Sequence, residues 1–193
     1  MSSNSGRATA LLIMHMQPPV TDMAADPSFL DRTGETIKAA RASGVDVIYV
    51  LAGYRPGYPE LGATSPVREM LAQHNLFVDG VSNAVHEKVA PQKGDVTVRT
   101  PRTSAFVGTD LEIVLRSRGI DHLVLAGIST GGVVLATLTD AREKDFAVTV
   151  LGDACADPDA GVHENLLKLY GGSPWFSEVT TCNEWASSLL ASV

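Results

Sequence analysis

Short apolar runs rich in β-branched residues alternate with longer segments of helical periodicity from one end of the chain to the other. The apolar runs predict strands near residues 9–15, 45–51, 95–99, 122–126, 146–151 and 178–181. The segments between them predict helices over residues 31–43, 65–74, 109–118, 131–144, 160–170 and 182–191. This alternation is typical of a parallel sheet with helices on both of its faces.

Local signals mark where several of these helices begin and end. Gly44 stands where a glycine commonly terminates a helix, and Ser65 before Pro66 is a cap followed by a first-turn proline. The spacing of Thr109 and Glu112 predicts a capping box at the start of the third helix. The predicted fold class is α/β, a three-layer α/β/α sandwich around a mainly parallel sheet of about six strands.

The length of the chain, 193 residues, is that of one domain. No internal repeat, low-complexity tract or interdomain linker interrupts it. We therefore expect a disordered lead over residues 1–7 and a single domain over residues 8–193. Gly, Pro and Tyr are concentrated in residues 53–65, and a loop of that length is either functional or a surface excursion.

Composition and charge narrow the classes of protein to which the chain can belong. An apolar content of 45% fits a globular protein, and the net charge of −7 argues against a nucleic-acid partner. The first ten residues lack a hydrophobic signal core, and no apolar run is long enough to span a bilayer. We therefore expect a cytoplasmic protein that acts on a small molecule and contacts neither nucleic acid nor membrane.

Side chains that bind metals are few and scattered. Cys155 and Cys182 form no C-x-x-C pair, and Cys155 is expected to be a small buried apolar residue. Four histidines lie far apart in the sequence, with no spacing typical of a zinc site: His74, His86, His122 and His163. We expect no metal site.

The most informative segment is the strand at 122–126, the turn at 127–132 and the helix that follows. The carboxyl end of a parallel strand that leads into a helix is the usual position of a ligand site. The backbone N–H groups of Ser129, Thr130, Gly131 and Gly132 suit a carboxylate or an oxyanion there. The turn lacks the G-x-G-x-x-G spacing of a dinucleotide site, so NAD is disfavoured and no cofactor is expected.

Several motifs, in order, resemble the isochorismatase-like (cysteine hydrolase) superfamily. They are LLIMHMQ, GYRPGYPE, RTPRTSAFVGTDLEIVLRSRGIDHLVLAGISTGGVV and TVLGDACAD, within residues 9–182. The SAF-x-GT-[DE]-L segment followed by LVLAG-x-x-T is the most specific. The resemblance implies a Rossmann-like fold, a homodimer or higher homo-oligomer, and in many members a cis peptide at the position of Ile128–Ser129.

The resemblance also implies an Asp–Lys–Cys triad, in which the Cys attacks an amide carbon. At the corresponding positions this chain has His15, Thr100 and Val133. All three reactive groups are replaced, so covalent amidase chemistry is expected to be absent. Members without the Cys cleave a vinyl ether with water and the Asp, which leaves non-covalent chemistry open.

His15 is the strongest candidate catalytic residue. Its unperturbed pKa near 6.5 suits a general acid or base, and it lies at the carboxyl end of an apolar strand. The alternative is a hydrogen-bonded histidine at a strand end. Gln17 is a second candidate, which could orient His15 or a substrate carbonyl.

Other residues are candidates for binding the substrate. Arg102 matches a position that is commonly basic in the family and could hold a carboxylate, as could Arg55. Tyr54 and Phe106 could form aromatic walls, and Thr100 and Val133 would line the pocket at the replaced positions. For each, a surface ion pair or core packing is the alternative.

These residues predict a hydrolase-fold enzyme of small-molecule metabolism that acts non-covalently, with His15 as general acid/base. The substrate is expected to be small and acidic, of ether, ester or lactone type. The alternative is a catalytically dead family member that serves as a ligand-binding or assembly subunit.

Overall fold

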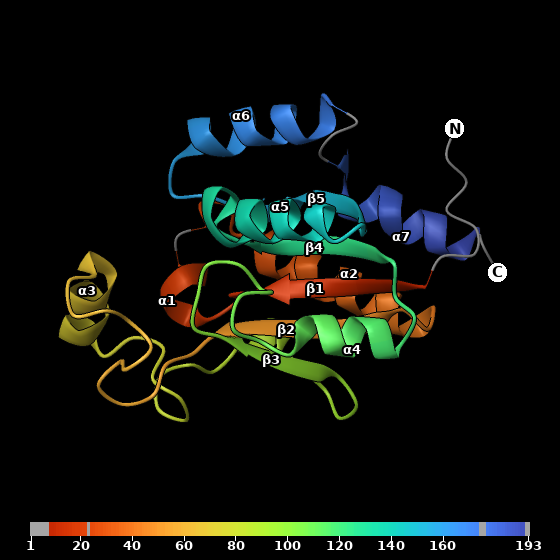
Figure 1. Cartoon of the computed structure of the whole chain (residues 1–193). Helices are drawn as coiled ribbons and strands as arrows, with labels where there is room; N and C mark the ends of the chain where they lie inside the picture. The colour runs from red at the N-terminus through yellow and green to blue at the C-terminus, as the bar shows by residue number, and fades with distance from the viewer. Residues whose placement is uncertain (1–7, 23, 174–176, 192–193) are drawn as a thin grey trace.

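Six parallel strands form one sheet in the computed structural model of the chain (Figure 1), which describes residues 8–22, 24–173 and 177–191. The strands are β1 (Thr9–Met14), β2 (Asp46–Ala52), β3 (Val96–Thr100), β4 (His122–Ile128), β5 (Ala147–Ala156) and β6 (Glu178–Thr180). Their order in the sheet is β3-β2-β1-β4-β5-β6. The lead expected over residues 1–7 lies outside the described residues.

Helices cover both faces of this sheet. They are α1 (Pro18–Thr21), α2 (Phe29–Ala42), α3 (Pro66–His74), α4 (Leu111–Ser117), α5 (Leu135–Glu143), α6 (Ala160–Gly171) and α7 (Cys182–Leu190), with a 3₁₀ turn at Glu87–Val89. In Figure 1, α4 and α5 lie in front of the sheet and α2 and α7 behind it. The predicted α/β/α sandwich is therefore confirmed.

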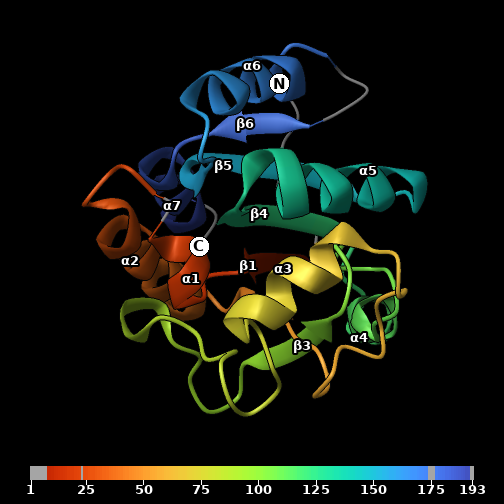
Figure 2. The same ribbon diagram turned by 90° about the vertical axis from the view of Figure 1, so that its left-hand side faces the viewer.

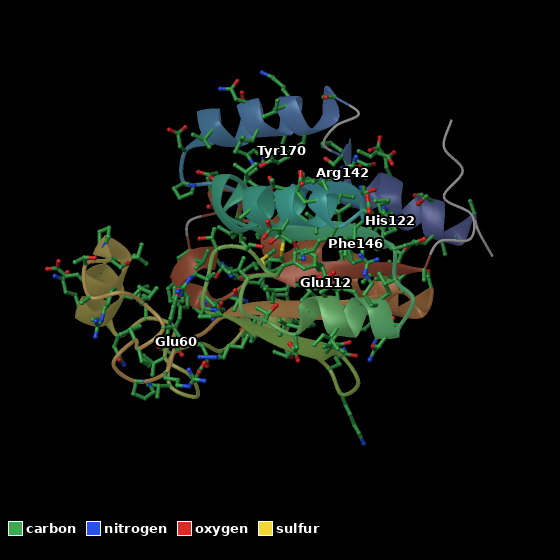
Figure 3. All side chains as sticks on the ribbon, in the orientation of Figure 1. Glu60, Glu112, His122, Arg142, Phe146 and Tyr170 are labelled. Carbon is green, nitrogen blue, oxygen red and sulfur yellow. The ribbon has the colours of Figure 1, made fainter. Side chains whose placement is uncertain are left out.

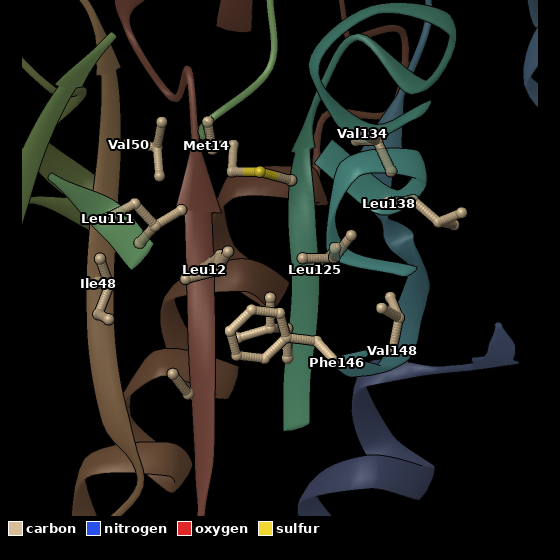
Figure 4. Packing of buried hydrophobic residues seen from close by; sticks show 14 of the residues in the cluster. Leu12, Met14, Ile48, Val50, Leu111, Leu125, Val134, Leu138, Phe146 and Val148 are labelled. Carbon is tan, nitrogen blue, oxygen red and sulfur yellow. The ribbon is translucent and has the colours of Figure 1, made fainter. Parts of the chain in front are cut away.

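Successive residues of β1 enter two separate hydrophobic cores because side chains alternate along a strand. Leu12 and Met14 belong to the core under α4 and α5, which Figure 4 shows. Leu11 and Ile13 belong to the core under α2 and α7. The strand is buried on both faces, which explains why it reads as a continuous apolar run.

The structure corrects several predicted boundaries. Strand β5 extends to Ala156, five residues beyond the predicted end, with a register irregularity opposite Leu125 and Gly127. The segment expected as a helix from residue 131 opens with a π turn at Thr130–Val134 before α5 begins. Within the described residues no helix is long and apolar enough to cross a membrane.

The start of α4 differs from the sequence prediction. The cap residue of α4 is Asp110, without a side-chain hydrogen bond, and Glu112 instead forms an ion pair with Lys144. A complete capping box forms at α7, between Thr181 and Glu184. Because α4 begins at Leu111, Glu112 is its second residue and Thr109 is not its cap, so the predicted box does not form.

The long connection between β2 and β3 lies at the carboxyl ends of the strands, beside α1 in Figure 2. It contains α3 and has a small core of its own. That core consists of Ala52, Tyr54, Tyr58, Leu71, Phe77 and Val78. The Tyr58 hydroxyl donates to the carbonyl oxygens of Leu71 and Leu76 at 2.9 and 3.0 Å. The connection is therefore a packed unit.

Candidate active site

A pocket of about 260 Å³ lies at the carboxyl ends of β1, β2 and β4. Ligands of open parallel sheets usually bind at this end. The lining residues are His15, Val20, Ala52, Tyr54, Val67, Met70, Leu71, Phe77, Arg102, Thr103, Ile128, Ser129, Gly132, Val133 and Pro158. Most of these side chains are apolar, and the few polar ones come from four separate segments of the chain.

His15 follows the last residue of β1 and adopts a left-handed backbone conformation, with φ of 54°. Its backbone N–H donates to the carbonyl oxygen of Val50 at 2.8 Å, which ties the turn to β2. The Nε2 atom is buried, and among the described residues it has no hydrogen-bond partner. Burial lowers the pKa of His15 to about 4, so the imidazole is neutral at pH 7.

The turn after β4 forms the neighbouring wall of the pocket. The Ile128–Ser129 peptide bond is cis, at the position where the sequence resemblance places one. A Cβ atom on Gly127 would lie 2.9 Å from the carbonyl oxygen of Met14, so this close approach of β1 and β4 requires glycine. The glycine at the end of the β4 motif thus positions the turn beside His15.

The turn uses several of its polar groups internally. The Gly131 N–H donates to the Asp157 carboxylate at 2.8 Å, and the Gly132 N–H donates to the Ser129 carbonyl at 3.1 Å. The Thr130 hydroxyl lies 2.8 Å from Nδ1 of His163. Ser129 and Gly132 line the pocket, whereas Thr130 and Gly131 do not.

Arg102 and Arg55 differ in their partners. Arg102 lines the pocket and donates to the carbonyl oxygens of Pro101 and Glu60 at 2.7 and 2.8 Å. No described carboxylate lies within ion-pair distance of it. Arg55 is exposed, pairs with the Glu60 carboxylate at 3.0 Å and does not line the pocket. Arg102 is thus the cation available to an acidic ligand.

Glu60, labelled in Figure 3, joins the connection between β2 and β3 to the sheet. Its carboxylate accepts from Arg99 of β3 as well as from Arg55. Burial disfavours ionisation of Glu60, but hydrogen bonds from backbone N–H groups and from Arg99 outweigh it and lower its pKa. The Arg99 side chain also pairs with Asp79 at 2.6 Å. This network ties the connection that carries Tyr54 to β3, the strand that precedes Arg102.

The remaining predicted site residues occupy different environments. Tyr54 lines the pocket, and burial raises its pKa above the ordinary value. Phe106 packs against Phe146, with ring centroids 5.9 Å apart, and does not line the pocket. The Gln17 amide is fully buried and bonds to the backbone of Ala52 and to the Asn83 carbonyl. Gln17 therefore joins β1 to β2.

Thr100 and Val133 also differ in position. The Thr100 hydroxyl is fully buried, 2.8 and 3.0 Å from the carbonyl oxygens of Arg102 and Ser104. It also accepts from the Arg102 N–H at 3.2 Å, and the residue does not line the pocket. Val133 has one surface in the core under α5 and another at the pocket.

Comparison with known proteins identifies the family of this fold and pocket. The isochorismatase domain profile matches residues 9–184. The chain belongs to the isochorismatase family. The ureidoacrylate amidohydrolase RutB of Yersinia enterocolitica is 30% identical over 203 residues, covering 91% of this chain and 88% of that protein.

Solved structures of isochorismatase-family proteins have the same architecture. A cysteine hydrolase from Pseudomonas syringae pv. phaseolicola superposes with a TM-score of 0.83 at 26% identity, covering 100% of both chains. An isochorismatase family protein from Desulfovibrio vulgaris superposes with a TM-score of 0.85 at 24% identity, covering 96% of this chain and 100% of that chain. The predicted resemblance is confirmed, and the relatives named for an activity support the hydrolase class.

The names of these isochorismatase-family relatives do not indicate an ether, ester or lactone substrate. The RutB name states an amidohydrolase, so the type of bond cleaved by this chain is not established by the comparison. Burial raises the pKa of both Cys155 and Cys182 to about 12, which makes either thiol a poor nucleophile at neutral pH. Among the described residues, no group of three His, Cys, Asp or Glu side chains is arranged to hold a metal.

Sequence reasoning missed the apolar wall that α3 adds to this isochorismatase-family pocket. Val67, Met70, Leu71 and Phe77 lie in the long connection, and all four line the pocket. The only signal was the Gly, Pro and Tyr content of residues 53–65, which marked a functional loop or a surface excursion. The pattern of α3 gave no indication of the cavity it faces.

Proposed function

We propose that this isochorismatase-family protein is a hydrolase that works without a covalent enzyme intermediate. Its substrate is a small carboxylate with an ether, ester or lactone bond. The observation that carries this proposal concerns His15, which lines the pocket. Its buried Nε2 atom has no hydrogen-bond partner among the described residues. A buried polar atom without a partner is costly unless a ligand or water satisfies it.

His15 acts as the general base in this proposal. For an ester or lactone, the neutral imidazole takes a proton from water as the water attacks the carbonyl carbon, and the imidazolium gives that proton to the alkoxide oxygen as its C–O bond breaks. For an enol ether, the imidazolium first protonates the vinyl carbon. Water then adds to the resulting oxocarbenium carbon and returns a proton to the imidazole before the alcohol leaves. A substrate carboxylate held by Arg102 also raises the pKa of the nearby imidazole, because a negative charge favours the protonated form. Ser129, Gly132 and Val133 line the pocket beside the reacting group, while the Gly132 N–H stays bonded to the Ser129 carbonyl.

The non-covalent character rests on the residues at the family's reactive positions. By the sequence motifs, His15, Thr100 and Val133 stand where many relatives have Asp, Lys and Cys. Val133 has no nucleophilic atom, and both cysteines of the chain are buried with raised pKa values. An acyl-enzyme intermediate therefore has no suitable thiol.

A second candidate function is a ligand-binding or assembly subunit without catalytic activity. The low pKa of His15 favours it, because a base with a pKa of about 4 accepts protons weakly at pH 7. This candidate shares the pocket and the Arg102 anchor with the enzyme proposal and differs only in the absence of turnover. A cytoplasmic location and a homo-oligomeric state stay predictions under both candidates.

Replacement of His15 tests the enzyme proposal. Asparagine is the suitable substitution because it tolerates a positive φ better than alanine does. We expect His15→Asn to reduce turnover at least about 100-fold on a panel of carboxylate-bearing enol ethers, esters and lactones, followed by product chromatography. His74→Asn, at an exposed position on α3, serves as the matched control.

The results separate the candidates. Equal turnover by wild type and His15→Asn contradicts the catalytic role of His15. Binding of panel members without wild-type turnover favours the inactive subunit. A covalent acyl adduct on Cys155 or Cys182, detected by intact mass during turnover, overturns the non-covalent mechanism.

A further inference from the structure

Two apolar side chains that line the pocket are about half exposed to solvent. Val67 is 46% exposed and Met70 is 47% exposed, and both line the pocket from α3. Leu71 and Phe77 line the same pocket and are almost buried, at 3% and 9% exposure. Burial of such surface by a ligand is favourable in proportion to the apolar area covered.

This wall is held in a fixed place. Leu71 and Phe77 belong to the small core of the connection between β2 and β3, and Tyr58 bonds to the backbone at the end of α3. The Glu60 network attaches the same connection to β3 through Arg99. The wall is thus preorganised, so a ligand that binds to it does not have to order a flexible loop.

The polar groups of the pocket come from other segments. Arg102 follows β3, His15 follows β1, and Ser129 follows β4. Arg102 has no carboxylate partner among the described residues, whereas Arg55 and Arg99 share Glu60. The pocket therefore combines one available cation with an apolar wall of four side chains.

We propose that the pocket is specific for amphiphilic carboxylates, which place an alkyl or aryl group against Val67, Met70, Leu71 and Phe77. This inference rests on the proposed function for the Arg102 end and extends it to the rest of the substrate. The pocket volume of about 260 Å³ lies just below the usual range for drug-sized ligands, which begins near ~300 Å³. The substrate is thus a small acid with one short apolar group.

A homologous series of acids tests the apolar subsite. Butanoate, hexanoate and octanoate are titrated into the wild-type protein by calorimetry. Each methylene that enters the wall is expected to raise affinity about fourfold until the pocket is filled. In Met70→Gln the increment per methylene is expected to fall below about twofold, because the wall loses apolar surface while α3 keeps a good helix former.

Ile113→Gln is the matched control, because Ile113 is a 72% exposed apolar residue on α4 outside the pocket. It is expected to leave the increment unchanged. Arg102→Gln is expected to weaken all three acids by the same factor and to keep the increment. This pattern assigns the carboxylate to Arg102 and the chain to α3.

Other results overturn the inference. Three results exclude an apolar subsite on α3. The acids do not bind, or the affinity gain per methylene in the wild type is near onefold, or Met70→Gln does not change that gain. If sedimentation shows a wild-type oligomer that Met70→Gln dissociates, a second copy of the chain covers this wall instead. Turnover that depends on His15 can persist in all these cases, so failure here is distinguishable from failure of the proposed function.

Discussion

His15 follows β1 and Thr100 ends β3, the two strands on either side of β2, but the structure uses the two residues in opposite ways. Thr100 is fully buried, and its hydroxyl bonds to the backbone of Arg102 and Ser104. His15 lines the pocket, and its Nε2 atom has no partner among the described residues. Both stand at positions where the family resemblance implies a reactive group.

The two positions differ in how their polar atoms are used. At position 100 the hydroxyl bonds to the local backbone, and the residue does not line the pocket. At position 15 the polar atom stays directed at a cavity, where a ligand or water can satisfy it. The pocket therefore keeps a polar atom that a ligand can reach at position 15 and none at position 100.

The largest expected effect on stability is the pH dependence caused by His15. The folded-state pKa of about 4 lies below the unfolded value near 6.5, so the unfolded chain binds the proton first as pH falls. The stability due to neutral His15 is fully present above pH 6.5 and is lost as pH falls toward 4. The loss is about 3 kcal/mol, measured by urea unfolding across this range.

His15→Asn isolates this contribution because asparagine does not titrate in that range. The difference in unfolding free energy between wild type and variant is expected to change by about 3 kcal/mol between pH 7 and pH 4. A difference that is constant with pH means that His15 is not desolvated in the folded protein. That result also contradicts the statement that His15, unlike Thr100, keeps a buried polar atom without a partner.

Thr100→Val tests whether the Thr100 hydroxyl has a structural role. The variant leaves the buried Ser104 carbonyl oxygen and the part-buried Arg102 N–H without the Thr100 hydroxyl, which is expected to cost about 2 kcal/mol of unfolding free energy. Thr97→Val, at an exposed position of the same strand, is the control and is expected to change stability by less than about 0.5 kcal/mol. Equal effects in thermal unfolding contradict a structural role for the Thr100 hydroxyl.

The smallest expected effect concerns the two arginines near the pocket. Arg102→Gln is expected to weaken hexanoate binding about tenfold, or about 1.4 kcal/mol, because it removes the cation that has no carboxylate partner. Arg55→Gln is expected to leave the affinity unchanged, since Arg55 pairs with Glu60 and does not line the pocket. Titration calorimetry measures both, and a larger loss in Arg55→Gln reverses the assignment.

The sequence predicted the sheet well because both faces of the central strands are buried, which produces continuous apolar runs at β1 and β4. It predicted His15, Ser129 and Val133 near one pocket because parallel strands end at the same edge. Periodicity could not show that Asp157 bonds to the turn or that Glu60 pairs with Arg99. Both depend on packing between distant segments of the chain.

Asp157 gives the turn after β4 a permanent internal counter-anion. Its carboxylate accepts the Gly131 N–H at the start of the helical segment that continues into α5. An anion tethered to the same chain is present at an effective concentration on the order of millimolar, so a free carboxylate competes poorly for that N–H. A dissolved acid is therefore expected to bind at the exposed guanidinium of Arg102 and not at the start of the helical segment.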